Sequence, residues 1–121
     1  MVNDRVRFVT HAGKTILFAD LSNCTRKEVL PLLDEVRRVV AKHPKGSLLT
    51  MGDFSNAQVD KSVATRIKEV LTLDRPYVKR SAWVGTETLP KVFYENIKNF
   101  SKREIPTFAT REEAMDWLVK E

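Results

Sequence analysis

The spacing of hydrophobic residues changes along the chain, and the changes mark the predicted elements. Residues 6–9 and 15–20 alternate as strands do, and the glycine-containing turn between them predicts a hairpin. From 29 to 40 the apolar residues return every three or four positions, as on one face of a helix. Thr25 and Glu28 precede this stretch with the Thr-x-x-Glu spacing of a capping box, so a helix should begin there.

The rest of the chain alternates strands with helices. The predicted strands are 48–53, 78–85 and 105–108, and the predicted helices begin near Val59, Thr88 and Thr110. Because crossover helices join parallel strands, the order β-β-α-β-α-β-α-β-α predicts an α/β fold with a single mixed, mostly parallel sheet of about five strands. No internal repeat or low-complexity segment stands out.

Length and composition predict a single domain over residues 1–121, since 42% of the residues are hydrophobic, which is enough for one packed core. The one cysteine, Cys24, excludes an internal disulfide and predicts a buried thiol in a reducing compartment. No apolar run reaches the ~20 residues of a membrane span, and the N-terminus does not read as a signal peptide. We therefore expect a cytoplasmic protein that does not span a membrane.

Charge changes this picture little. The chain has 21 Lys and Arg against 16 Asp and Glu, a formal net charge of +5. Such an excess attracts acidic partners when it gathers on one face. In the sequence the basic residues are spread among carboxylates without interleaved aromatic residues, so we expect a solvated surface and no nucleic-acid partner.

Polar residues cluster where the predicted parallel strands end. They are Asp20, Ser22, Asn23, Asp53, Ser55, Asn56, Gly85, Thr86, Glu87 and Thr110. Carboxyl ends of parallel strands meet at one edge of a sheet, so these groups should converge, although capping of the following helices explains each of them individually. The set contains no histidine to activate a serine, so a hydrolase built on Asp20, Asp53 or Glu87 has the least support. Dedicated metal-loop and glycine-rich spacings are absent, and we expect neither a metal nor a cofactor.

The segment before the second helix offers a different chemistry. Asp60 and Ser62 would lie at the helix start, where a phosphate on the serine would face free amides and the positive end of the dipole. The alternative is that Asp60 caps the helix and Ser62 is an ordinary surface residue.

Three segments carry a family resemblance: the strand 48–55, the strand end 82–85 and the closing stretch 110–118 with its Glu-Ala-x-x-Trp-Leu pattern. Over almost its whole length the chain resembles the SpoIIAA-like branch of STAS domains. The resemblance implies a small sheet with helices packed mainly on one side and no catalysis. Classical members are anti-sigma factor antagonists, which bind a regulatory kinase and are inactivated by phosphorylation of a serine that opens the second helix. Ser62 resembles that serine, while Lys61 replaces the first serine of the family's Asp-Ser-Ser-Gly motif.

The resemblance leaves two functions open. The first is a regulatory or protein-binding module that acts through Asp53, Ser55, Asn56, Asp60 and Ser62. The second follows from a similarity of this branch to CRAL-TRIO proteins and is a carrier or sensor of an apolar small molecule or lipid, with a pocket lined by Phe93, Ile97 and Phe100. The expected partners are accordingly a regulatory kinase or other protein, or an apolar ligand, and a homodimer is also open.

Overall fold

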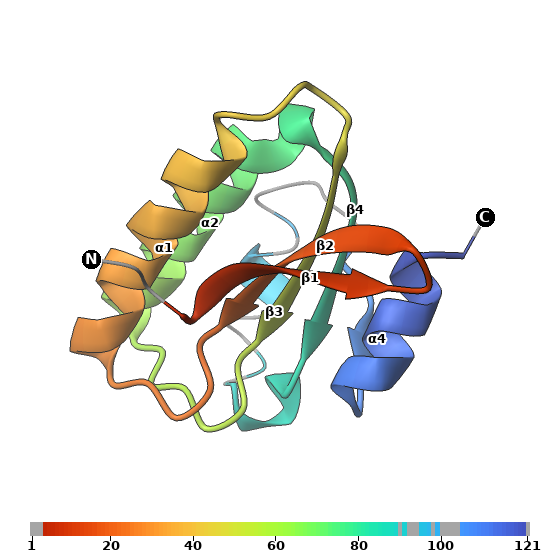
Figure 1. Ribbon diagram of the computed structural model, residues 1–121. Helices are drawn as coiled ribbons and strands as arrows, with labels where there is room; N and C mark the ends of the chain where they lie inside the picture. The colour runs from red at the N-terminus through yellow and green to blue at the C-terminus, as the bar shows by residue number, and fades with distance from the viewer. Residues whose placement is uncertain (1–3, 90, 92–94, 98, 100–104, 121) are drawn as a thin grey trace.

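A five-stranded sheet lies at the centre of the computed structural model, which describes residues 4–89, 91, 95–97, 99 and 105–120 (Figure 1). The strands are β1 (Val6–His11), β2 (Lys14–Asp20), β3 (Leu48–Asp53), β4 (Val78–Val84) and β5 (Thr107–Phe108). Their order in the sheet is the order in the chain. Only β1 and β2 pair antiparallel, whereas the other neighbours are parallel. The predicted mixed, mostly parallel sheet is therefore confirmed.

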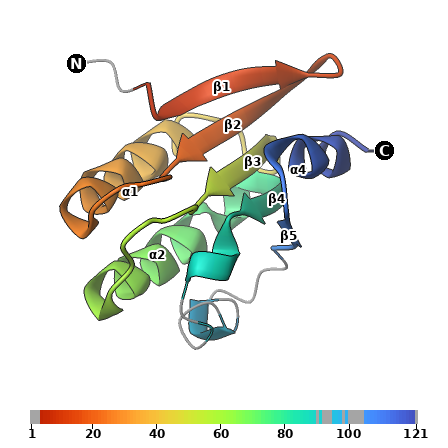
Figure 2. The same ribbon diagram turned by 90° about the horizontal axis from the view of Figure 1, so that it is seen from below.

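Helices cover both faces of this sheet unequally (Figure 2). The helical segments with described bounds are α1 (Arg26–Val40), α2 (Lys61–Asp74), η1 (Arg75–Tyr77), η2 (Thr86–Thr88) and α4 (Arg111–Leu118). One core cluster contains buried residues of α1 and α2 together with Ile97, and a second joins α4 to the opposite face of the sheet. Packing mainly on one side is thus confirmed, with α4 alone on the other side among the described helices.

Capping side chains decide where the helices begin. The hydroxyl of Thr25 accepts from the backbone N–H of Glu28 at 3.3 Å, and the Glu28 carboxylate accepts from the N–H of Thr25 at 3.0 Å. This is the predicted capping box. Asp60 caps α2 by accepting from the N–H of Val63 at 2.9 Å, so α2 begins at Lys61, slightly later than expected.

Close packing between β3 and β4 explains one glycine in the sheet. The Phe54 and Trp83 rings meet edge to face, with centroids 4.7 Å apart, on the side covered by α1 and α2. A Cβ on Gly52 would lie 3.2 Å from the Phe54 ring and 3.3 Å from Trp83, so this position leaves little room for a side chain. Cys24 is buried in the same cluster, as predicted.

Part of the predicted third helix falls outside the described residues, and Phe93 and Phe100 are among the residues not described. The described residues of that segment include 95–97, which are helical. None of the helices in the described ranges combines the length and apolar character that a membrane span requires.

Candidate functional site

Two neighbouring strands end in the same tetrapeptide, Asp-x-Ser-Asn, at residues 20–23 and 53–56. Asp20 and Asp53 are partners in the parallel register of β2 and β3. Asn23 and Asn56 both have a φ of 58°, in the left-handed region where asparagine is enriched among non-glycine residues. This short repeat, at a separation of 33 residues, was not predicted from the sequence.

Each tetrapeptide folds back on its own aspartate. The Asp20 carboxylate accepts from the backbone N–H and the hydroxyl of Ser22, at 3.0 and 2.5 Å. Asp53 accepts from the same two groups of Ser55, at 2.9 and 2.7 Å. The turns also bind each other, because the N–H of Asn23 donates to the carbonyl of Ser55 at 2.8 Å. The polar residues that follow β2 and β3 therefore lie together at this edge of the sheet, as predicted.

Arg111, the first residue of α4, joins the two aspartates. Its Nε donates to Asp53 Oδ2 at 2.7 Å, and its Nη2 donates to Asp20 Oδ1 at 3.3 Å. The guanidinium also lies 4.7 Å from the centre of the Phe18 ring, a cation–π contact. Arg111 was not among the predicted site residues. Its position directly after the cap residue Thr110, at the same edge of the sheet, was the available signal.

The network satisfies its buried charges internally. Asp53 is 4% exposed, and its two oxygens are occupied by Ser55 and Arg111. Burial alone would raise the pKa of Asp20, but the hydrogen bonds from Ser22 and the charges of Arg111 and Arg5 outweigh it and hold that pKa below its ordinary value. The Arg111 guanidinium thus lies between the two aspartates, and the described residues contain no cluster of three potential metal ligands.

Gly85 closes this edge of the sheet beside the second turn. Its φ is 73°, and a Cβ there would approach the backbone nitrogen of Ser55 to 2.5 Å. Glu87, which was considered with the two aspartates, is exposed on η2 and does not share the burial of Asp53. Asp53 and Ser55 are therefore parts of a closed hydrogen-bond network.

The other predicted residues lie on the surface around the start of α2. Asn56 is exposed and donates to Asn23 at 3.3 Å. The hydrogen bond from the N–H of Val63 and the nearby Arg26 guanidinium lower the pKa of Asp60. Arg26 Nη1 lies 3.0 Å from Asp60 Oδ2 and ties the start of α1 to the start of α2.

Ser62 lies in the first turn of α2, as predicted, and is exposed. It lines a surface hollow of about 260 Å³ between the N-terminal ends of α1 and α2. We call this the helix-start hollow; its lining is Arg26, Lys27, Leu30, Asp60, Ser62 and Val63. The five predicted residues differ in burial: Asp53 is buried, Ser55 and Asp60 are partly buried, and Asn56 and Ser62 are exposed.

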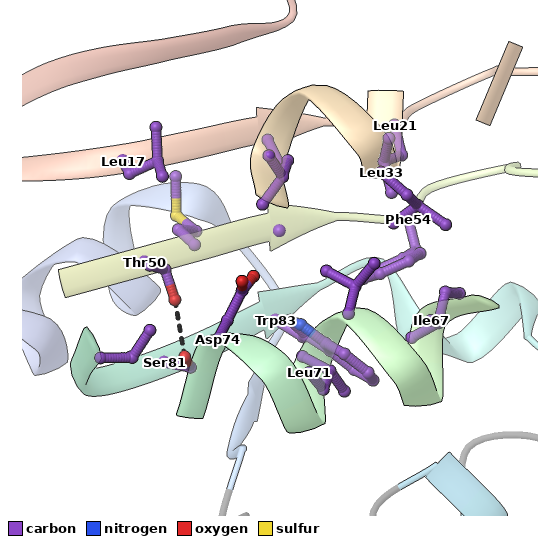
Figure 3. A pocket seen from close by; sticks show the side chains of 16 residues that line it. Leu17, Leu21, Leu33, Thr50, Phe54, Ile67, Leu71, Asp74, Ser81 and Trp83 are labelled. Atoms are coloured by element: carbon purple, nitrogen blue, oxygen red, sulfur yellow. Dashed lines mark hydrogen bonds between the residues drawn. The ribbon is translucent and has the colours of Figure 1, made fainter. Parts of the chain in front are cut away.

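A second concavity, of about 70 Å³, lies between the sheet and helices α1 and α2 (Figure 3). Leucine, isoleucine, valine and aromatic side chains line most of it. Its polar groups are Thr50 and Ser81, whose hydroxyls are 2.6 Å apart, and the buried Asp74. Asp74 accepts from Arg37 at 3.2 Å. We call this space the internal cavity.

The internal cavity does not coincide with the ligand pocket predicted from the sequence. Ile97 is fully buried in the core cluster that also contains residues of α1 and α2, and other side chains line the cavity. Phe93 and Phe100 lie outside the described residues. A ligand pocket at these three positions stays a prediction.

The sheet order and the placement of the helices define a SpoIIAA-like fold, which is the fold that the resemblance implied. A crystal structure of an uncharacterized protein of the DUF3478 family from Shewanella loihica PV-4, with a SpoIIAA-like fold, superposes with a TM-score of 0.66. The alignment covers 93% of this chain and 91% of that one at 14% sequence identity, a likeness that establishes the fold. No protein-family model and no curated protein matches the sequence.

Proposed function

We propose that this protein is a non-enzymatic regulatory module that binds another protein through the helix-start hollow and is controlled by charge at Ser62. The observation that carries the proposal is the exposed Ser62 hydroxyl in a hollow that also contains Arg26, Lys27 and Leu30. A SpoIIAA-like fold is compatible with this role, but a fold alone does not define a function.

The composition of the hollow supports protein binding. Leu30 is 36% exposed, so it presents an apolar contact within a charged rim, an arrangement common at protein interfaces. Asp60 and Arg26 hold the two helix starts together at 3.0 Å, which gives the surface a defined shape before a partner arrives.

Phosphorylation of Ser62 would act on this surface without disturbing the core. A phosphate adds about two negative charges, and near a helix start it is favoured by the dipole. Here it would also approach Arg26 and Lys27 and compete with Asp60 for Arg26. Phosphorylation would therefore change the charge around the hollow and, with it, the affinity for the partner protein.

The proposal can be tested by quantitative affinity capture from a lysate of the source cells, with phosphosite mapping of the recovered protein. We expect a saturable partner for the wild type, altered binding of it by Ser62→Asp, and unaltered binding by Thr72→Asp. Thr72 is the matched control because it is exposed on α2 at the far end of the helix. Equal binding by all three proteins and no phosphate on Ser62 would contradict the charge-controlled module. The fraction in which the partner is found would also test the proposed cytoplasmic location.

The internal cavity supports a second candidate function, a carrier or sensor of a small apolar molecule. Its volume of about 70 Å³ is smaller than the ~150 Å³ cavity that accepts benzene in another protein. A lipid chain would therefore require α1 and α2 to separate from the sheet. Native mass spectrometry before and after denaturation tests this function: a bound apolar molecule lost on denaturation supports it, whereas the bare mass of one or two chains opposes it.

A further inference from the structure

A basic hollow of about 600 Å³ lies where β2, β3 and β4 begin, beside the C-terminal end of α4. Half of its lining is cationic and none is acidic; the residues are Lys14, Thr15, Ser47, Leu49, Lys79, Arg80, Leu118 and Lys120. The four cations come from three distant parts of the sequence. Basic residues that are spread along the sequence thus come together around this hollow.

Two of these cations have structural partners at the C-terminal end of α4 or just beyond it. Lys14 Nζ donates to the carbonyl of Val119 at 3.2 Å, and Arg80 donates to the carbonyls of Trp117 and Lys120. Arg80 also lies over the Trp117 ring, 5.7 Å from its centre. Cations at a helix C-terminus offset the negative end of its dipole, so capping of α4 accounts for Lys14 and Arg80.

Capping does not account for the other two cations. Lys79 and Lys120 are exposed, and neither forms an ion pair within the described part of the chain. Lys79, Lys120 and the neighbouring Arg80 give this concavity a positive potential, and the partly buried Leu49 and the buried Leu118 also line it. An anion in the hollow would relieve the repulsion among these cations.

We propose that the basic hollow binds a compact phosphate-bearing anion, held by Lys79 and Lys120 over the charged floor formed with Arg80. Its volume is in the range of small-molecule sites, and lysine is a common phosphate-binding residue. A single-stranded nucleic acid would need a longer basic track with aromatic stacking platforms. The phosphate group can belong to a soluble metabolite or to an anionic lipid headgroup. The proposal is independent of the helix-start hollow, which lies at the opposite ends of the parallel strands.

Nuclear magnetic resonance titration of the ¹⁵N-labelled full chain with inositol hexakisphosphate and, separately, with pyrophosphate tests the site. We expect saturable shifts of the amides of residues 79, 80 and 120, which weaken as salt is added. Shifts that are confined to other surfaces, or no shifts, would overturn the proposal. Because this arm uses the wild type, it does not depend on the folding of any variant.

Charge-reversal variants distinguish binding in the hollow from non-specific binding caused by the overall positive charge of the protein. The double variant Lys79→Glu/Lys120→Glu should bind the same probe at least about tenfold more weakly. The control Lys42→Glu/Lys61→Glu has the same net charge and changes exposed lysines outside the hollow, so it should bind within about twofold of the wild type. A similar loss in both variants would overturn the proposed site.

Two further arms identify the source of the phosphate. A lipid headgroup would be supported if the protein co-sediments with vesicles of phosphatidylcholine and phosphatidic acid but not with vesicles of phosphatidylcholine alone. The Lys79→Glu/Lys120→Glu variant should then no longer co-sediment with the mixed vesicles. Binding of the soluble probes without vesicle binding would support a metabolite. Tighter binding of a single-stranded oligonucleotide than of either phosphate probe would overturn the compact-ligand proposal.

Discussion

Asp20 and Asp53 lie opposite each other at the ends of two parallel strands and share the guanidinium of Arg111. This relationship joins elements from the beginning, middle and end of the chain. Arg111 brings α4 to the carboxyl edge of the sheet. Ser55 binds the other oxygen of Asp53, whereas Ser22 and Arg111 bind the same oxygen of Asp20. The edge beside the proposed protein-binding surface is consequently held together by hydrogen bonds among three parts of the chain.

Replacing Arg111 with leucine should lower the free energy of unfolding by about 2–3 kcal/mol, because the buried Asp53 carboxylate loses its charged donor. Urea denaturation followed by tryptophan fluorescence measures this change. The control is Arg66→Leu, whose ion pairs with Asp34 and Glu69 are at the surface and should contribute less than about 1 kcal/mol. Equal effects of the two substitutions would show that the Arg111 network is not a special source of stability.

Gly85→Ala should be far more destabilising than Gly13→Ala. Both glycines have a positive φ, of 73° and 78°, so each alanine incurs backbone strain of about 1 kcal/mol. Only at position 85 would the new Cβ also meet the Ser55 backbone, at 2.5 Å, whereas nothing lies within 4 Å at position 13. We expect a total loss of about 3 kcal/mol or more for Gly85→Ala. Thermal unfolding of the two variants provides the comparison, and similar melting temperatures would contradict the close approach of Gly85 to Ser55.

The stability of the protein should fall in acid partly through Asp20. Its pKa is lowered on folding, so the charged form is favoured in the native state. The resulting stability is present above the unfolded pKa of about 4 and is lost as the pH falls through the lower folded value. When the pH is lowered from about 6 to about 3, the free energy of unfolding should therefore fall less for Asp20→Asn than for the wild type, as measured by urea titrations. A steeper acid dependence in the variant would refute this assignment.

Two leucines of α1 distinguish the internal cavity from the proposed protein-binding surface. Leu33 lines the cavity and is 5% exposed, whereas Leu30 is 36% exposed in the helix-start hollow. Leu33→Ala should reduce the free energy of unfolding by about 3 kcal/mol and enlarge the cavity, as measured by urea denaturation and xenon binding. Leu30→Ala should lower the free energy of unfolding by less than about 1 kcal/mol but should weaken capture of the partner. The reverse pattern of stability loss would contradict the placement of these side chains.

Local sequence signals predicted the elements well because each depends on neighbouring residues. The capping box at Thr25 and Glu28 specifies the start of α1, and strand-end polarity located Asp20 and Asp53 at one edge of the sheet. Ser62 was correctly placed in the first turn of α2 because Asp60 is a strong cap residue. The apolar periodicity of α1 and α2 likewise predicted their buried faces.

The sequence by itself determined the order of the elements, the caps and the polar strand ends, since short-range hydrogen bonding and hydrophobic periodicity encode them. Only the tertiary structure decided that Arg111 lies between Asp20 and Asp53, that Lys79 and Lys120 share a hollow, and that a cavity remains beneath α1 and α2. These features depend on how distant segments pack through space. The register of the sheet and the volumes of facing side chains set them, and neither is encoded in a local pattern.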